Sequence, residues 1–162
     1  MNAFFGLVAL VLILGPGTAP TGSWAARWPL NPRPEIVARF DPPSSAYGAG
    51  HRGVDLLGQP GEPVLAALGG RITYAGNLAG RGVVVIDHGS RRTTYEPVLA
   101  RVHVGDQVSA GEALGTLETG GSHCFPRSCL HWGLIEGDQY LDPLSLVGDR
   151  DPVRLLPLLS AT

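Results

Sequence analysis

From residue 50 onward, apolar and polar positions alternate in short runs, and Gly, Asn or Pro separates one run from the next. Alternation with a period of two turns every second side chain toward a core, so each run predicts a half-buried β-strand. Residues 83–86 (VVVI) are continuously apolar and β-branched, which predicts a central strand buried on both faces. The predicted strands are residues 63–67, 71–75, 82–87, 92–98, 113–118 and 130–135.

Before residue 50 the chain is Pro-rich and irregular, apart from an apolar extended piece at residues 36–40 and a turn or loop at 41–45. Residues 151–162 carry leucines at helix-like spacing, but Pro157 interrupts them. The 23 Gly and 14 Pro among 162 residues disfavour a helix bundle, because both are poor helix formers. The length and composition predict one domain of short strands joined by tight turns.

Residues 3–14 form an apolar run that ends at Gly15-Pro16 and precedes several small residues. A helix needs roughly 20 apolar residues to cross a bilayer, so this run predicts no stable membrane span. It is typical of a signal peptide, with cleavage after Ala19, Ala25 or Ala26, and we therefore expect a secreted or cell-envelope protein. Because no Lys or Arg precedes the run, a buried core segment is the alternative.

The formal net charge of −2 gives no indication of a nucleic-acid or anionic-membrane partner. The chain contains no lysine, since all 12 basic residues are arginine. This bears on residues 102–108 (VHVGDQV), which resemble the hairpin of biotinyl and lipoyl carrier domains. Those domains attach their cofactor to a lysine, so the carrier function is chemically excluded.

Two histidines and one aspartate are candidate metal ligands: His51 and Asp55, four residues apart, and the distant His131. On an extended strand residues four apart lie about 13 Å from each other. Zinc–ligand bonds are roughly 2.0–2.2 Å, so a shared ion requires a bend, which Gly53 permits. Two imidazoles and one carboxylate leave a fourth position for water, which is typical of a catalytic zinc site. The alternative is a surface His–Asp pair and an unrelated core histidine.

Several stretches match, in order and with sensible spacing, the lysostaphin- or LytM-type zinc endopeptidases, which the chain resembles over roughly residues 36–147. The matching stretches are residues 50–56 (GHRGVDL), 61–67 (GEPVLAA), 70–76 (GRITYAG), 85–89 (VIDHG), Tyr95, 104–108 (VGDQV) with Gly111, 130–134 (LHWGL) and 140–143 (YLDP). The resemblance implies a compact antiparallel β-sheet or sandwich domain that cleaves peptide cross-links of bacterial peptidoglycan. It also implies that His51, Asp55 and His131 bind zinc.

Two positions depart from the family's pattern. The family has a histidine two residues before the last ligand and another two residues after the tyrosine that corresponds to Tyr95, whereas this chain has Cys129 and Pro97 there. Each acid, base or oxyanion donor typically contributes a factor of about 10² to 10³. We therefore expect substitutes at the site: Glu96 as a base, and Tyr95 or His123 as donors. The alternative for His123 is an exposed loop histidine.

Cys124 and Cys129 lie close together beside the expected site. In an exported protein such a pair favours a disulfide, whose short loop would contribute about 2 kcal/mol to stability. Alternatively Cys129 is a fourth zinc ligand or a small buried side chain. Of the remaining candidates, we expect His88 to be structural, His103 to be solvated and Trp132 to lie in the core.

The sequence thus predicts a signal peptide at 1–26, a Pro-rich segment at 27–50, a LytM-like peptidase domain at 51–147 and a tail at 148–162. The expected function is that of a zinc metalloendopeptidase acting on the peptide stems of peptidoglycan. The competing function is non-catalytic: a domain of the same fold that binds peptidoglycan or activates a separate cell-wall amidase. The retained ligands favour the enzyme, and the absent histidines favour the binding domain.

Overall fold

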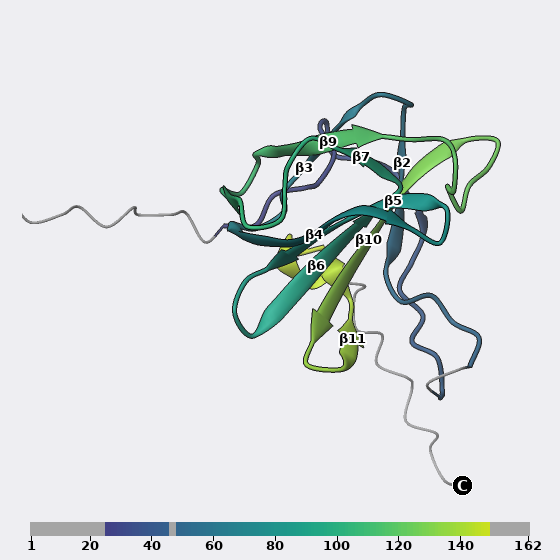
Figure 1. The fold of residues 1–162 in the computed structure, drawn as a ribbon. Coiled ribbons are helices and arrows are strands. Elements are labelled where there is room, and N and C mark those ends of the chain that lie inside the picture. Colours follow the sequence, from purple (N-terminus) through teal and green to yellow (C-terminus); the bar gives the residue numbers. More distant parts are fainter. Residues whose placement is uncertain (1–24, 46–47, 150–162) are drawn as a thin grey trace, which may run out of the picture.

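The computed structural model describes residues 25–45 and 48–149, which form two antiparallel β-sheets and one short 3₁₀ helix (Figure 1). This confirms the predicted all-β fold. The main sheet contains, in spatial order, β1 (Ile36–Ala38), β2 (Val54–Gly58), β10 (Ser128–Glu136), β6 (Arg91–Glu96), β5 (Arg81–Asp87), β4 (Gly70–Leu78) and β8 (Gln107–Val108). The hairpin strand β11 (Gln139–Leu141) also pairs with β10.

The smaller sheet has the order β3 (Pro63–Leu65), β9 (Ala113–Leu117) and β7 (Val98–Ala100), and it lies across the main sheet in Figure 1. The helix η1 (Pro143–Leu146) follows β11, and the Asp142 side chain caps it by accepting a hydrogen bond from Leu144 N. One continuous core joins the sheets, because buried residues of the smaller sheet such as Leu114 and Leu117 pack in the same cluster as Leu56 and Ile86 of the main sheet.

The register of the central strands sorts their side chains into two rows. Residues directly opposite each other in an antiparallel pair point to the same face of the sheet. Val54, Trp132 and Tyr95 are such partners on β2, β10 and β6, and all three are fully buried in the core. The next row, Asp55, His131 and Glu96, therefore points to the opposite face. The candidate ligands Asp55 on β2 and His131 on β10 are therefore direct neighbours across this strand pair.

Most predicted strands are present, with shifted ends. The run at 92–98 is divided into β6 and β7 at Pro97, and residues 130–135 lie within the longer β10. The central position of β5 is confirmed, although Val85 is only half-buried. Trp132 is in the core and the His103 side chain is 87% exposed, as expected. The strands β2, β8 and β11 were not predicted from the alternation.

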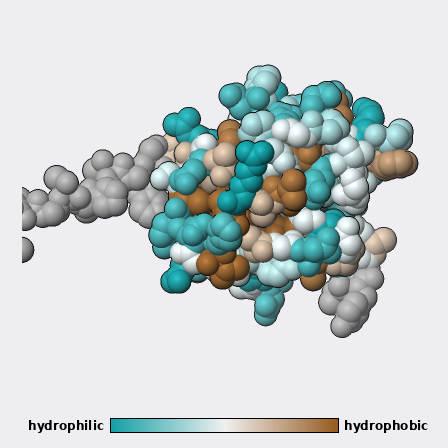
Figure 2. Space-filling model, turned by 45° about the horizontal axis from the view of Figure 1, so that its top comes forward, coloured by the Kyte–Doolittle hydropathy of each residue, from teal (hydrophilic) through white to brown (hydrophobic). Residues whose placement is uncertain are grey.

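The expected signal peptide falls almost wholly on residues 1–24, and the expected tail on 150–162, which lie outside the described residues. Within residues 25–45 and 48–149, no helix has the length and apolar character required to span a bilayer. On the face seen in Figure 2, brown hydrophobic surface is broken up by teal hydrophilic side chains.

Candidate metal site

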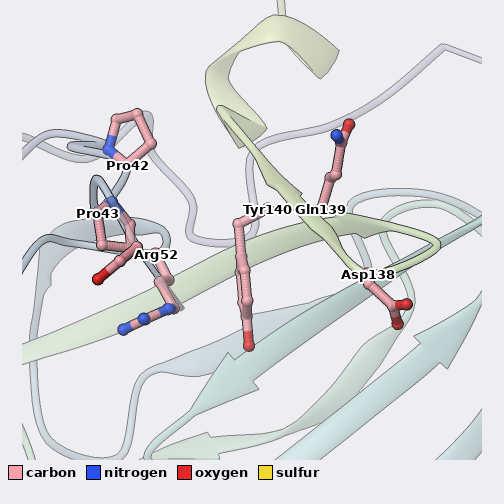
Figure 3. A pocket seen from close by; sticks show the side chains of 7 residues that line it. Pro42, Pro43, Arg52, Asp138, Gln139 and Tyr140 are labelled. Atoms are coloured by element: carbon pink, nitrogen blue, oxygen red, sulfur yellow. The ribbon is translucent and has the colours of Figure 1, made fainter. Parts of the chain in front are cut away.

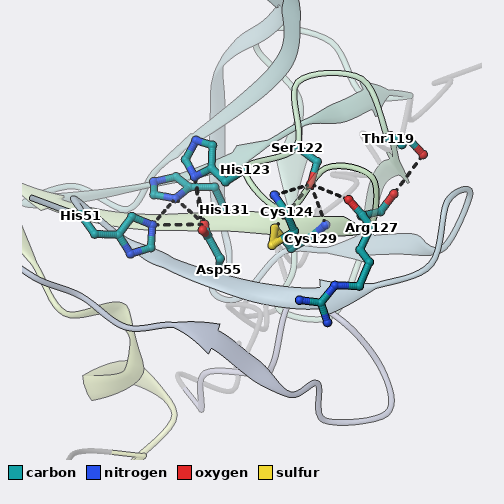
Figure 4. Close-up of a disulfide and its surroundings, with 10 residues drawn as sticks. His51, Asp55, Thr119, Ser122, His123, Cys124, Arg127, Cys129 and His131 are labelled. Carbon is teal, nitrogen blue, oxygen red and sulfur yellow. Dashed lines mark hydrogen bonds and ion pairs between the residues drawn. A yellow bond between two sulfur atoms is a disulfide. The ribbon is translucent and has the colours of Figure 1, made fainter.

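Four side chains converge on the face of the main sheet that points away from the core (Figure 4). His51 Nε2 lies 3.1 Å from Asp55 Oδ1 and 3.1 Å from His131 Nδ1, and His131 Nδ1 lies 2.9 Å from Asp55 Oδ1. His123 Nδ1 lies 3.2 Å from the same Asp55 oxygen. One potential ligand atom from each residue falls within 4.8 Å of the other three. The structure therefore brings together the three residues expected to bind metal, and adds His123.

His51 is held by the segment that precedes it in sequence. Its backbone forms a two-way bridge with Asp41, and its ring Nδ1 lies 2.7 Å from the carbonyl oxygen of Arg39. A carbonyl can only accept, so Nδ1 carries the proton and donates it, which leaves the lone pair on Nε2 facing Asp55 and His131. Histidines that bind metals are commonly fixed in this way through their second ring nitrogen. The contact with Arg39 has no sequence signal, because any residue could supply a carbonyl.

Gly53 serves the site in a way that differs from our expectation. The chain does bend between His51 and Asp55, but Gly53 is not among the glycines with positive φ. Instead, a Cβ at this position would lie 2.7 Å from the His131 ring atoms Cε1 and Nε2 and 2.5 Å from the Trp132 carbonyl oxygen. The absence of a side chain therefore allows the His131 ring to lie close to the backbone beside the cluster.

The Asp55 carboxyl is 5% exposed and lies among three imidazoles. Burial by itself would raise the pKa of Asp55, but the hydrogen bond with His131 and the charges of the surrounding histidines lower it. The net effect lowers the pKa of Asp55 below its usual 3.8. The group is therefore a carboxylate at neutral pH, which is the form that binds a metal.

His123 reaches the cluster from the loop between β9 and β10. Its ring centroid is 4.8 Å from that of His131 and 6.0 Å from that of His51, and its side chain is 42% exposed. Cys124, the next residue, forms a disulfide with Cys129 at the start of β10. The predicted disulfide is thus present, and the alternatives in which Cys129 is a thiolate ligand or a free buried thiol are wrong.

Tyr95 does not lie at the cluster, so its predicted role as a donor there is wrong. The side chain is on the core face of β6, fully buried, and its hydroxyl accepts a hydrogen bond from Ala67 N at 2.9 Å. Burial raises the pKa of Tyr95 to about 12. Its hydroxyl also lies 3.0 Å from Thr93 Oγ1, which is 2.8 Å from His88 Nε2. Tyr95 therefore belongs to a buried polar chain, and His88 is structural as predicted.

Glu96 lies on the face of the sheet that carries the cluster, but its carboxylate is already paired with another side chain. It is the register partner of His131 on the same face of the sheet, which is where the sequence placed a candidate base. Its carboxylate, however, is ion-paired with Arg81, whose Nε lies 2.9 Å from Oε2. A base must be free to contact the attacking water, and this ion pair engages the Glu96 carboxylate with Arg81 instead. His123 is therefore better placed than Glu96 for proton transfer.

The chemistry of the donor atoms fits a zinc ion. Asp55 is a carboxylate, and His51 Nε2 presents a lone pair to it at 3.1 Å. Acceptor atoms this close require either a shared proton or a cation between them. A nitrogen-and-oxygen set of two imidazoles and one carboxylate is a known ligand set for catalytic zinc. His51, Asp55 and His131 are thus the residues that would hold the metal, with His123 on their exposed side.

A separate hollow of about 420 Å³ lies beside Arg52 and Tyr140 (Figure 3). The Arg52 guanidinium carbon is 5.6 Å from the centre of the Tyr140 ring. The hollow is lined by Pro42, Pro43, Ser45, Arg52, Asp138, Gln139 and Tyr140. This lining differs from the four clustered residues and lacks their convergent donor atoms. We therefore place the candidate site at the cluster on the sheet face.

Three comparisons relate this architecture to known proteins. The chain is 46% identical over 153 residues to an uncharacterised protein of Mycobacterium tuberculosis, covering 91% of this chain and 61% of that protein. It is 27% identical over 139 residues to the murein hydrolase activator NlpD of Salmonella dublin, covering 82% of this chain and 33% of that protein. The chain thus spans less than two thirds of either relative.

Among solved structures, the catalytic domain of the antimicrobial peptidase lysostaphin from Staphylococcus simulans superimposes with a TM-score of 0.59 at 26% identity. The match covers 72% of this chain and 93% of that domain. Residues 49–143, more than half of the chain, match the model of peptidase family M23. This stretch includes all four clustered residues. The chain therefore belongs to peptidase family M23.

Proposed function

We propose that this protein is a zinc-dependent metalloendopeptidase that cleaves peptide cross-links of bacterial peptidoglycan. The observation that carries the proposal is the convergence of His51 Nε2, His131 Nδ1 and Asp55 Oδ1 at mutual distances of 2.9–3.1 Å. Membership of family M23 and the likeness to the lysostaphin catalytic domain support the same reaction class. A closed structural zinc site would have no need of an exposed side.

Each residue of the cluster has a distinct part in the proposed reaction. Zinc, when bound, would polarise the substrate's carbonyl group and lower the pKa of a water molecule to about 7. His51, fixed by the Arg39 carbonyl, and the charged Asp55 hold the site together with His131. His123 is the exposed member, and we assign it the transfer of a proton from the attacking water to the leaving amine. This assignment replaces the roles that the sequence suggested for Tyr95 and Glu96.

A second function is favoured by a specific observation. Both auxiliary histidine positions of the family hold other residues, Pro97 and Cys129, and one relative bears the name of a murein hydrolase activator. The alternative proposal is therefore a domain of the same fold that binds peptidoglycan or activates a separate cell-wall amidase. The family and the apolar segment at residues 3–14 support a secreted or cell-envelope location for either function.

The two functions separate in one experiment. The purified protein is incubated with peptidoglycan sacculi, with and without a metal chelator, and released fragments are identified by mass. The endopeptidase predicts chelator-sensitive release of muropeptides, absent in Asp55→Ala and retained in His103→Ala, a control in which an exposed side chain is removed. Binding to sacculi without release of fragments at any zinc concentration would select the binding domain.

A further inference from the structure

The loop histidine His123 precedes a cysteine that is bonded to the strand position at which the family's pattern has a histidine. The family's pattern places a histidine at position 129, two residues before His131 and therefore on the same face of β10. Cys129 is there instead, and only 1% of it is exposed. The sulfurs of Cys124 and Cys129 lie within 4.8 Å of a ligand atom of Asp55. The disulfide therefore adjoins the metal site directly.

The loop that carries His123 has little regular structure of its own. Between the end of β9 at Leu117 and the start of β10 at Ser128 it contains two consecutive glycines, Gly120 and Gly121. Gly121 has φ +81, a conformation that glycine adopts readily. Ordering such a segment costs about 1–2 kcal/mol per residue in backbone entropy. Something must therefore fix the loop for His123 to stay beside Asp55.

Both neighbours of His123 are fixed to β10. On one side, Cys124 is joined to Cys129 by the disulfide. On the other side, Ser122 Oγ accepts hydrogen bonds from Cys129 N at 2.9 Å and Cys124 N at 3.2 Å, and donates one to Arg127 O at 3.2 Å (Figure 4). His123 is thus held between two anchored residues, with its ring against Asp55 and His131.

We propose that the Cys124–Cys129 disulfide, together with Ser122, is the positioning element that holds His123 beside Asp55 in place of a histidine on the strand. This inference deepens the proposed function, since it concerns the same site. His51 is placed by Arg39 and Asp41, and the other two ligands by β2 and β10, so opening the disulfide releases His123 and leaves these three together. The bridge thereby couples the thiol redox state to the composition of the site.

The position of His123 can be measured by NMR without metal. In the metal-free protein, ring-proton contacts are expected between His123 and His131, because their centroids are 4.8 Å apart. His123 signals are identified by their loss in His123→Ala. In Cys124→Ser/Cys129→Ser, and in the wild type reduced with a phosphine, the contact should disappear and the His123 signal should approach that of the exposed His103. Persistence of the contact overturns the inference, and so does global unfolding, because the bridge would then hold the whole fold.

Zinc affinity, measured by competition with a chromophoric chelator, gives an independent test in the form of a double-mutant cycle. Partners that hydrogen-bond to metal ligands typically contribute 10- to 100-fold in affinity. We expect His123→Ala and the double serine variant each to weaken zinc binding by about 10-fold, and their combination to add nothing further, because both remove the same contact. Additive losses overturn the inference. Absence of zinc binding in the wild type, with the His123–His131 contact present, overturns only the proposed function.

Discussion

At the scale of single residues, the site depends on three side chains that share one small volume. His51→Ala or Asp55→Ala removes one of three converging ligand atoms and should abolish stoichiometric zinc binding, which is otherwise expected at about one ion per chain. Metal analysis after gel filtration measures the stoichiometry. His103→Ala, an exposed histidine, serves as the matched control and should retain the metal. Absence of metal from the intact protein would contradict the site.

Gly53→Ala tests the close approach of the His131 ring. The added methyl would lie 2.5–2.7 Å from the Trp132 carbonyl and the ring atoms, so the strand or the ring must move. We expect a loss of about 1–3 kcal/mol in the free energy of unfolding, together with weaker zinc binding. Gly120→Ala is the control, since a Cβ there meets no atom within 4 Å. Equal denaturation midpoints for both variants would argue against this role of Gly53.

His88 gives the protein a pH-dependent stability. Burial lowers its pKa below 6.5, and the hydrogen bond to Gly69 O and the charge of Asp87 offset this only in part. Below pH 6.5 the unfolded chain therefore binds a proton that the folded chain resists, and stability falls as the pH decreases, until the folded-state pKa is also passed. Urea denaturation from pH 7.5 to pH 5 should show a smaller decrease for His88→Gln than for the wild type; parallel curves would refute the effect.

Residue types and spacing left the candidate ligand set open, and the resemblance singled out three residues that the structure brings together. His51, Asp55 and His131 were identifiable from the resemblance, and the disulfide from the isolated cysteine pair. The contacts that orient them were not, because the Arg39 carbonyl and the backbone bridge to Asp41 carry no side-chain signature. Tyr95 and Glu96 were both expected at the site, but neighbouring residues on a strand point to opposite faces of the sheet. Only Glu96 lies on the face that carries the cluster.

At the scale of elements, the alternation of apolar and polar residues predicted strands with one exposed face. It missed β2, whose five residues are almost all buried and therefore show no alternation. It also missed the short strands β8 and β11, which pair at edges of the main sheet. The division of residues 92–98 at Pro97 followed from the change of sheet between β6 and β7.

The strands β5 and β7 come very close to each other at Gly82. Gly82 lies at the start of β5, and a Cβ on it would clash with the carbonyl oxygen of Val98 in β7. The two sheets can come this close only without a side chain there. Gly82→Ala should therefore lower the free energy of unfolding by about 1–3 kcal/mol while zinc affinity changes little. Gly120→Ala again provides the comparison in the same denaturation series, and an unchanged Gly82→Ala would contradict the argument.

At the scale of the whole molecule, the proposed metal binding would be linked to folding. An ion that binds only the folded protein stabilises it by about 2.7 kcal/mol at a concentration of 100 Kd. For a domain of this size we expect a rise in Tm on the order of 10 °C on adding zinc, reversed by a chelator. Differential scanning fluorimetry measures the shift, and Asp55→Ala should show none. A similar rise in Asp55→Ala would place the zinc elsewhere on the protein.

The attachment of His51 to Arg39 and Asp41, just after β1, has a consequence for any shortened form of this protein. A fragment that begins at residue 49, where the family match begins, keeps every clustered side chain. It loses β1 and the backbone oxygen that decides which ring nitrogen of His51 bears the hydrogen. A shortened form that keeps the support of His51 therefore starts upstream of Arg39, and one cut at the start of the family match would discard the part of the chain that orients this ring.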